Sequence, residues 1–123
     1  MAQLAILTRD PEPAQAPAID RGHLARMTFG DRSLERELLH LFDRQAEILI
    51  ERMRTSESAA IATLAHTLKG SAAGIGASSV ASAAEATELA AIRSPAECRL
   101  AIDRLAKAAD DARAFIAELL REH

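Results

Sequence analysis

The chain has few of the residues on which several large classes of protein depend. Its 123 residues include three phenylalanines and no tyrosine or tryptophan, so it lacks aromatic side chains that could stack on unpaired bases. The formal net charge is -3, which provides no basic surface for a phosphate backbone, and we expect no nucleic-acid partner. The single cysteine, Cys98, excludes a disulfide within the chain.

Long hydrophobic runs are also missing. No apolar stretch approaches the roughly 18–20 residues of a membrane span, so we expect no membrane partner. The amino-terminal sequence MAQLAIL has neither the basic start nor the long apolar region of a signal peptide. These features predict a cytoplasmic domain.

Glycine and proline, which interrupt helices, are scarce. There are five glycines and four prolines, and Pro11, Pro13 and Pro17 all lie near the amino terminus. Because each proline disfavours helix at the residue before it, we expect residues 1–18 to form an extended arm. Alanine, the strongest helix former, occupies 28 positions. The composition therefore predicts an all-α domain over residues 19–123.

Capping residues and apolar periodicity divide this domain into five helices. The predicted spans are 21–28, 32–54, 57–74, 78–93 and 95–121. Asp20 and Asp31 are the expected N-caps of the first two helices, and Ser56 is expected to cap the third. Ser94 and Glu97 have the spacing of a capping box at the start of the last helix.

Apolar side chains recur every third or fourth residue in the longer segments, as in amphipathic helices that bury one face. In the second segment this stripe consists of Leu34, Leu38, Phe42, Leu49 and Met53, with Leu39, Leu41 and Ile50 beside it. In the third it consists of Ile61, Leu64, Leu68, Ala72 and Ile75. In the last it consists of Cys98, Ile102, Leu105, Ala109, Ala112, Ile116 and Leu119.

Short connections between these helices favour an antiparallel up-down-up-down four-helix bundle with a short additional N-terminal helix. A chain of this length can bury such a core without a partner, so we expect a monomer. A longer coiled coil or an obligate dimer is the alternative that the pattern leaves open.

His66 differs from the other three histidines in its surroundings. It lies off the apolar stripe of its helix and is expected to face solvent. Its neighbours on the same helical face are mostly small, and they are Ala62, Thr63, Lys69, Gly70 and Ala73. A flat, cleared surface around an imidazole suits contact with a second macromolecule, and we add Thr67, adjacent in sequence, to this partner-binding set.

Lys69 and Gly70 suggest what that macromolecule delivers. A glycine within a helix costs about 0.8–1 kcal/mol relative to alanine, so Gly70 indicates a surface that must stay clear. Lys69 is one of two lysines in a chain with 13 arginines, and its compact ammonium could approach an anion carried on the imidazole. A phosphoryl group fits this role. An ordinary solvated His–Lys pair remains the alternative on spacing alone, and no histidine has partners at metal-ligand spacing.

The string HTLKGSA beginning at His66, followed by Gly76-Ala77, resembles the signature of histidine-containing phosphotransfer (HPt) domains. The resemblance extends over about residues 19–120. It implies that His66 accepts a phosphoryl group from a receiver-domain aspartyl phosphate and passes it to another receiver, while Lys69 offsets charge. It also implies response-regulator receivers and a hybrid histidine kinase as partners. The domain would be a phosphoryl carrier rather than an enzyme, with no ATP site and no cofactor, because the receiver supplies Mg²⁺.

One position departs from this resemblance. Counting along the antiparallel helices on either side of the turn near Gly76 places Glu88 at the height of His66, where some family members have glutamine. A glutamate could repel a phosphoryl group, pair with Lys69 or point elsewhere, and the sequence leaves these orientations open. The same counting across the turn near residue 55 places Arg44 and Gln45 close to that height.

Two other functions are compatible with the sequence. The chain could be a phosphotransfer module excised from a hybrid or chemotaxis-type histidine kinase, which would share the chemistry and could differ in its direct phosphoryl donor. It could also be an adaptor that docks on receivers without phosphate exchange. The presence of both His66 and Lys69 argues against the adaptor.

Overall fold

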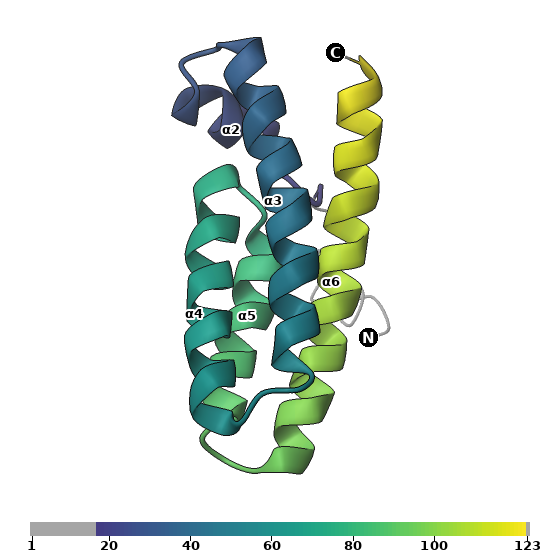
Figure 1. The fold of residues 1–123 in the computed structure, drawn as a ribbon. Coiled ribbons are helices and arrows are strands. Elements are labelled where there is room, and N and C mark those ends of the chain that lie inside the picture. Colours follow the sequence, from purple (N-terminus) through teal and green to yellow (C-terminus); the bar gives the residue numbers. More distant parts are fainter. Residues whose placement is uncertain (1–16, 123) are drawn as a thin grey trace, which may run out of the picture.

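A computed structural model describes residues 17–122, which form five helices joined by short turns (Figure 1). The helices are α2 (Arg21–Met27), α3 (Arg32–Met53), α4 (Ser58–Ile75), α5 (Ser78–Ala90) and α6 (Pro95–Glu122). This part of the chain contains no strand, so the predicted all-α class is confirmed. Helix α5 ends three residues before the predicted boundary. The extended arm predicted for residues 1–18 lies almost entirely outside the described residues.

Three of the predicted helix starts are confirmed by their capping hydrogen bonds. The side chains of Asp20 and Asp31 accept backbone N–H groups three residues further on, at 3.1 and 3.0 Å. Ser94 Oγ accepts the N–H of Glu97 at 3.1 Å. The backbone N–H of Ser94 donates to the Ala90 carbonyl, so this group is satisfied by the preceding helix rather than by the Glu97 side chain.

The predicted cap at Ser56 is wrong. Its hydroxyl donates to the Arg52 carbonyl at 2.7 Å and therefore closes α3 instead of opening α4. The N-cap of α4 is Glu57, whose side chain makes no capping hydrogen bond. The carbonyls at the end of α3 lack helical partners, and the Ser56 hydroxyl reaches one of them first.

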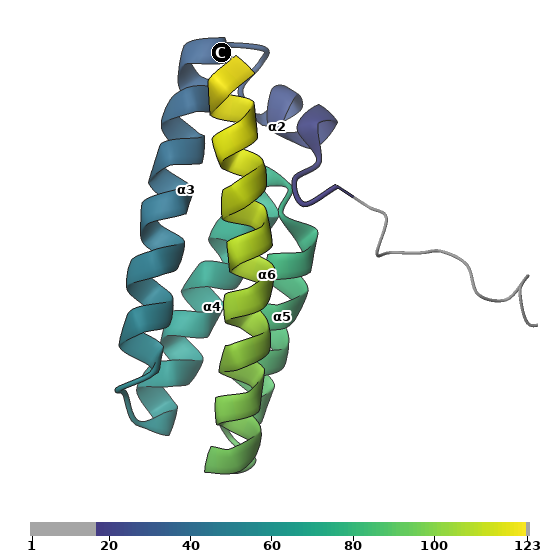
Figure 2. The same ribbon diagram turned by 90° about the vertical axis from the view of Figure 1, so that its right-hand side faces the viewer.

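Helices α3, α4, α5 and α6 surround one hydrophobic core. Helix α3 packs on α4 and α6, and α5 packs on the same two helices (Figures 1 and 2). Figure 1 shows successive helices connected at alternating ends of the molecule. Helices α4 and α5 contribute many small core residues, including Ala65, Ala72 and Ala84, each 0% exposed. These alanines allow the two helices that carry the candidate site to pack closely.

Helices α3 and α6 extend past α4 and α5 at one end, where α2 packs over the end of α4 (Figures 1 and 2). At 1.5 Å per residue, α5 is only about 20 Å long, whereas α6 is about 42 Å long. Ile19 and Leu24, at 0% and 2% exposed, fill this end of the core. The first turn of α3 extends past this end of the core, so Leu34 is 37% exposed. The prediction that Leu34 belongs to the core stripe is therefore wrong.

The turn between α4 and α5 anchors α2. Gly76 has a φ of 82°, which favours glycine, and its carbonyl accepts the Asp20 N–H at 2.9 Å. His23 Nε2 lies 3.1 Å from the Gly74 carbonyl oxygen. These contacts fix the turn that sets the alignment of α4 against α5.

Candidate functional site

His66 projects from the middle of α4 on the side opposite to the core. The residues that α4 buries are Ile61, Ala65, Leu68, Ala72 and Ile75. Because these share one face of the helix, His66 points outward and its side chain is 66% exposed. Its Nδ1 lies 3.1 Å from Glu88 Oε2, whereas Nε2 has no hydrogen-bond partner among residues 17–122. The second ring nitrogen is therefore open to solvent.

Glu88 bridges the two residues that the sequence identified. Its Oε2 contacts His66 Nδ1, and its Oε1 lies 3.4 Å from Lys69 Nζ. The Glu88 and Lys69 side chains are 30% and 32% exposed, so the pair is partly shielded from water. The orientation that the sequence left open is thus resolved: Glu88 faces His66 and pairs with Lys69 at the same time.

The carboxylate of this cluster favours a proton on Nδ1 of the imidazole. Partial burial works against ionisation of Glu88, but the hydrogen bonds and positive charges of Lys69 and His66 outweigh it and hold the pKa of Glu88 below its usual value. An ionised carboxylate accepts from Nδ1–H and favours the neutral tautomer in which Nε2 carries the lone pair. The cluster stabilises the fold above the ordinary carboxyl pKa, and this contribution is lost as pH falls through the lowered value.

Thr87 holds the segment of α5 that carries Glu88. It is 0% exposed, and its hydroxyl lies 2.9 Å from the Ala83 carbonyl oxygen and 3.3 Å from that of Ala101 on α6. This contact links α5 to α6 directly behind the site. The direction of Glu88 therefore depends on packing from three helices.

Two of the small residues around His66 leave space at the surface. Gly70 and Ala73 are exposed, and a Cβ added at Gly70 would meet no atom within 4 Å, leaving aside its neighbours in its own helix. The hydroxyls of Thr63 and Thr67 donate to carbonyls one turn back, at 3.2 and 3.1 Å, and are directed along the helix. Ala62 differs from the prediction, because it is partly buried and packs against the core.

Arg44 and Gln45 line a groove between α3 and α4 and make no contact with the imidazole. This groove has a volume of about 460 Å³, and its lining residues are Leu41, Arg44, Gln45, Ile48, Leu49 and Ser71. A smaller groove of about 220 Å³ shares three of these residues and continues to Met27 and Ile75. Neither Arg44 nor Gln45 has a hydrogen bond or ion pair with His66.

Leu41 and Ile48 are residues of this surface that the sequence analysis missed. They are 58% and 46% exposed, although Leu41 was predicted beside the core stripe. With Arg44 and Gln45 they occupy positions i, i+3, i+4 and i+7, which lie on one helical face. This spacing is the signal that could have identified a second, partner-facing stripe on α3.

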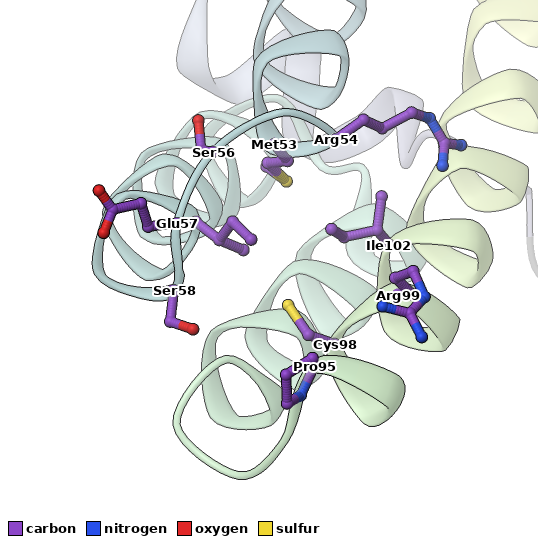
Figure 3. Close-up of a pocket in the computed structure, with 10 residues that line it drawn as sticks. Met53, Arg54, Ser56, Glu57, Ser58, Pro95, Cys98, Arg99 and Ile102 are labelled. Atoms are coloured by element: carbon purple, nitrogen blue, oxygen red, sulfur yellow. The ribbon is translucent and has the colours of Figure 1, made fainter.

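A cavity larger than these grooves lies elsewhere in the described residues. It has a volume of about 600 Å³ where α3 joins α4 and α6 begins, and Met53, Arg54 and Cys98 are among its lining residues (Figure 3). His66, Lys69 and Glu88 do not contribute to it. Burial raises the pKa of the Cys98 thiol, partly offset by the charge of Arg99, so the thiol stays protonated and is a poor nucleophile.

No group of three or more histidine, cysteine, aspartate or glutamate side chains in residues 17–122 could hold a metal ion. None of the described helices is both long and apolar enough to cross a membrane.

Comparisons with known proteins agree with this geometry. The family model for the Hpt domain matches residues 34–119, which is more than half of the chain. One similar solved structure is the X-ray structure of a rice protein assigned as a histidine-containing phosphotransfer protein. It is 19% identical, with a TM-score of 0.77, and the alignment covers 98% of this chain and 87% of that chain. The search of curated proteins returned no match. As the motif around His66 predicted, the chain belongs to the Hpt domain family.

Proposed function

We propose that this Hpt domain relays a phosphoryl group between receiver-domain aspartates through a phosphohistidine at His66. Hpt domains are phosphoryl carriers in phosphorelays, where they interact with response-regulator receivers. The observation that carries the assignment to His66 is its exposed imidazole, with Nδ1 on the Glu88 carboxylate and Nε2 toward solvent. A hybrid histidine kinase as the upstream partner, a monomeric antiparallel bundle and a cytoplasmic location are parts of the same proposal.

Each transfer exchanges one bond to phosphorus for another. The lone pair of His66 Nε2 attacks the phosphorus of an aspartyl phosphate, an N–P bond forms, and the aspartate leaves with the electron pair of the broken P–O bond. Nδ1 keeps its proton, which Glu88 accepts in a hydrogen bond. Such reactions depend mainly on positioning and charge stabilisation. Lys69 is the residue that we expect to approach the phosphoryl oxygens.

The domain supplies the nucleophilic imidazole and a docking surface, and the receiver supplies the other groups that the transfer needs. We propose that the domain binds no ATP and no cofactor, and that Mg²⁺ comes from the receiver. The small, exposed residues Gly70 and Ala73 would allow the receiver's aspartate to reach the imidazole. The adjoining groove, with Leu41 and Ile48 exposed, would seat apolar side chains of the receiver.

The decisive experiment replaces the nucleophile. Incubation with a phosphorylated receiver should label the wild-type domain with an acid-labile, base-stable phosphoryl group. His66→Gln should keep the melting temperature and take up no label. His40→Gln, which removes another exposed histidine from the neighbouring helix α3, is the matched control and should be labelled normally. Labelling of His66→Gln would rule out His66 as the acceptor.

The two alternative functions make different predictions in the same assay. A module of a hybrid or chemotaxis-type kinase would be labelled efficiently by a histidine kinase catalytic domain with ATP. A docking adaptor would bind receivers and take up no label. The contact of His66 and Lys69 with one carboxylate favours a chemical role over an adaptor.

A further inference from the structure

Lys69, the cation that should stabilise a phosphoryl group on His66, already has a partner. Its Nζ lies 3.4 Å from Glu88 Oε1 in a partly shielded position. Among the described residues, Glu88 is the charged group that contacts His66. Lys69 is linked to the imidazole through its ion pair with the Glu88 carboxylate. To neutralise phosphoryl oxygens, Lys69 would have to leave this carboxylate or be shared with it.

Glu88 also adds a negative charge next to the modified ring. A phosphoryl group on Nε2 would carry about two negative charges on the imidazole whose Nδ1 lies 3.1 Å from Glu88 Oε2. The phosphoryl group lies across the ring from Nδ1, within the roughly 8–10 Å over which like charges still repel at ordinary salt, and partial burial weakens the screening by water. This repulsion raises the free energy of the phosphorylated domain relative to the free domain.

The proton on Nδ1 favours departure of the phosphoryl group by a second route. After attack through Nε2, the ring carries the phosphoryl group on one nitrogen and the proton on the other, and the hydrogen bond to Glu88 keeps that proton in place. When a receiver carboxylate then attacks the phosphorus, the N–P bond breaks and its electron pair returns to Nε2. The leaving group is a neutral imidazole that has kept its Nδ1 proton, and this is a much better leaving group than an imidazolate.

On the basis of the proposed function, we infer that Glu88 makes phosphorylated His66 a short-lived donor of high transfer potential, so that the domain passes phosphoryl groups on rather than storing them. Glutamine at this position, as in some family members, could still accept the Nδ1 hydrogen bond. It would carry no charge and would leave Lys69 free for the phosphoryl oxygens. Glu88→Gln therefore separates the charge of residue 88 from its hydrogen bond.

The test measures the lifetime of the phosphohistidine. The wild type, Glu88→Gln and Glu85→Gln are labelled with phosphoramidate, and the decay of the ³¹P signal is followed after the donor is removed. Removal of one charge at this range should lengthen the lifetime of Glu88→Gln by about three- to tenfold. The equilibrium with a purified receiver should shift toward phosphorylated His66 by a similar factor. Glu85, exposed on α5 one turn earlier, gives a control with the same charge change, which should behave as the wild type.

Lys69 provides a second, independent readout. If Glu88 holds Lys69, then Lys69→Ala should shorten the lifetime more in the Glu88→Gln background than in the wild type. In the unphosphorylated protein, ¹⁵N NMR should show the Nδ1–H tautomer of His66 in the wild type and in Glu88→Gln, and a mixture of tautomers in Glu88→Ala. A merely structural role of Glu88 would produce neither pattern.

The outcomes separate this inference from the function on which it rests. A labelled wild type with an equal or shorter lifetime in Glu88→Gln, or with the same effect of Lys69→Ala in both backgrounds, overturns the inference alone. A wild type that takes up no label on His66 from phosphoramidate or from a phosphorylated receiver overturns the proposed function as well.

Discussion

The presence of a glycine at position 70 of the site is not explained by helix stability, since alanine would stabilise the helix more. An added Cβ would meet open space, so the glycine is not required by packing against other helices. We expect Gly70→Ala to stabilise the domain by about 0.8–1 kcal/mol, the difference in helix propensity. Gly70→Gln should stay folded but slow transfer from a receiver, because its side chain would stand beside the imidazole. Thermal melts and transfer assays on both variants measure the two effects.

Ala60→Gln is the control for added bulk, because Ala60 is exposed near the start of the same helix. It should transfer at the wild-type rate. Labelling by phosphoramidate should also change little in Gly70→Gln, since a small donor needs less room. A Gly70→Gln variant that accepts from a receiver as fast as the wild type would show that clearance is not the reason for this glycine.

The part of the site that lies on one helix could be predicted from the spacing of residues in the sequence. His66, Lys69 and Gly70 lie on one helix, where separations of three and four residues determine which side chains are neighbours. Counting across a short turn also gave the height of Glu88. Its direction depends on how α4 and α5 pack and on the side-chain rotamer, which no spacing determines. The bridge to both His66 and Lys69 therefore required the structure.

The turn between α4 and α5 is the element on which the site geometry depends most. Gly76 has a positive φ, and a Cβ there would lie 3.0 Å from the Asp20 carbonyl oxygen and 3.1 Å from the Asp20 Cβ. Gly76→Ala therefore combines backbone strain of about 1–2 kcal/mol with a collision that the backbone cannot easily relieve. We expect a loss of stability above about 2 kcal/mol in urea unfolding, together with slower phosphotransfer.

Gly30→Ala separates strain from collision. Gly30 also has a positive φ, of 75°, but an added Cβ would meet nothing within 4 Å. This variant should lose only about 1–2 kcal/mol. Equal losses of stability in Gly30→Ala and Gly76→Ala would mean that the close approach to Asp20 is not a real constraint on the turn.

Helices differed in how well the sequence predicted them. All seven seam residues predicted for the last helix are buried, because α6 is long and alternates apolar and charged faces. Helix α5 ends at Ala90 rather than at residue 93, since the residues from Ala90 to Arg93 include no glycine or proline to mark a stop. Leu34 was misplaced for another reason, because its exposure depends on how far the neighbouring helices extend, which periodicity within α3 cannot show. Leu41 belongs instead to the second, exposed stripe of α3, whose spacing the sequence does show.

At the scale of the whole molecule, exposed apolar residues are distributed unevenly around the bundle. Leu41 and Ile48 border a groove between α3 and α4, the helix that carries His66. Leu100 is 50% exposed on α6, which packs on α3 and α5. Isolated exposed leucines are common on protein surfaces, but apolar residues that line a groove beside a reactive side chain indicate a docking surface.

This distribution predicts which substitutions weaken receiver docking. Leu41→Asp and Ile48→Asp should each weaken binding to a receiver domain by about tenfold or more, as expected when an apolar contact residue is lost from an interface. Leu100→Asp is the matched control, with a similar exposed fraction on a different helix, and should bind as the wild type. Calorimetry gives the affinities, and melting curves should show that all three variants stay folded. Phosphoramidate should label His66 normally in each, because the groove is not part of the chemistry. If Leu100→Asp weakens binding as much as Ile48→Asp, the receiver does not select the α3 groove, and the effect comes from the added negative charge on a chain that is already acidic overall.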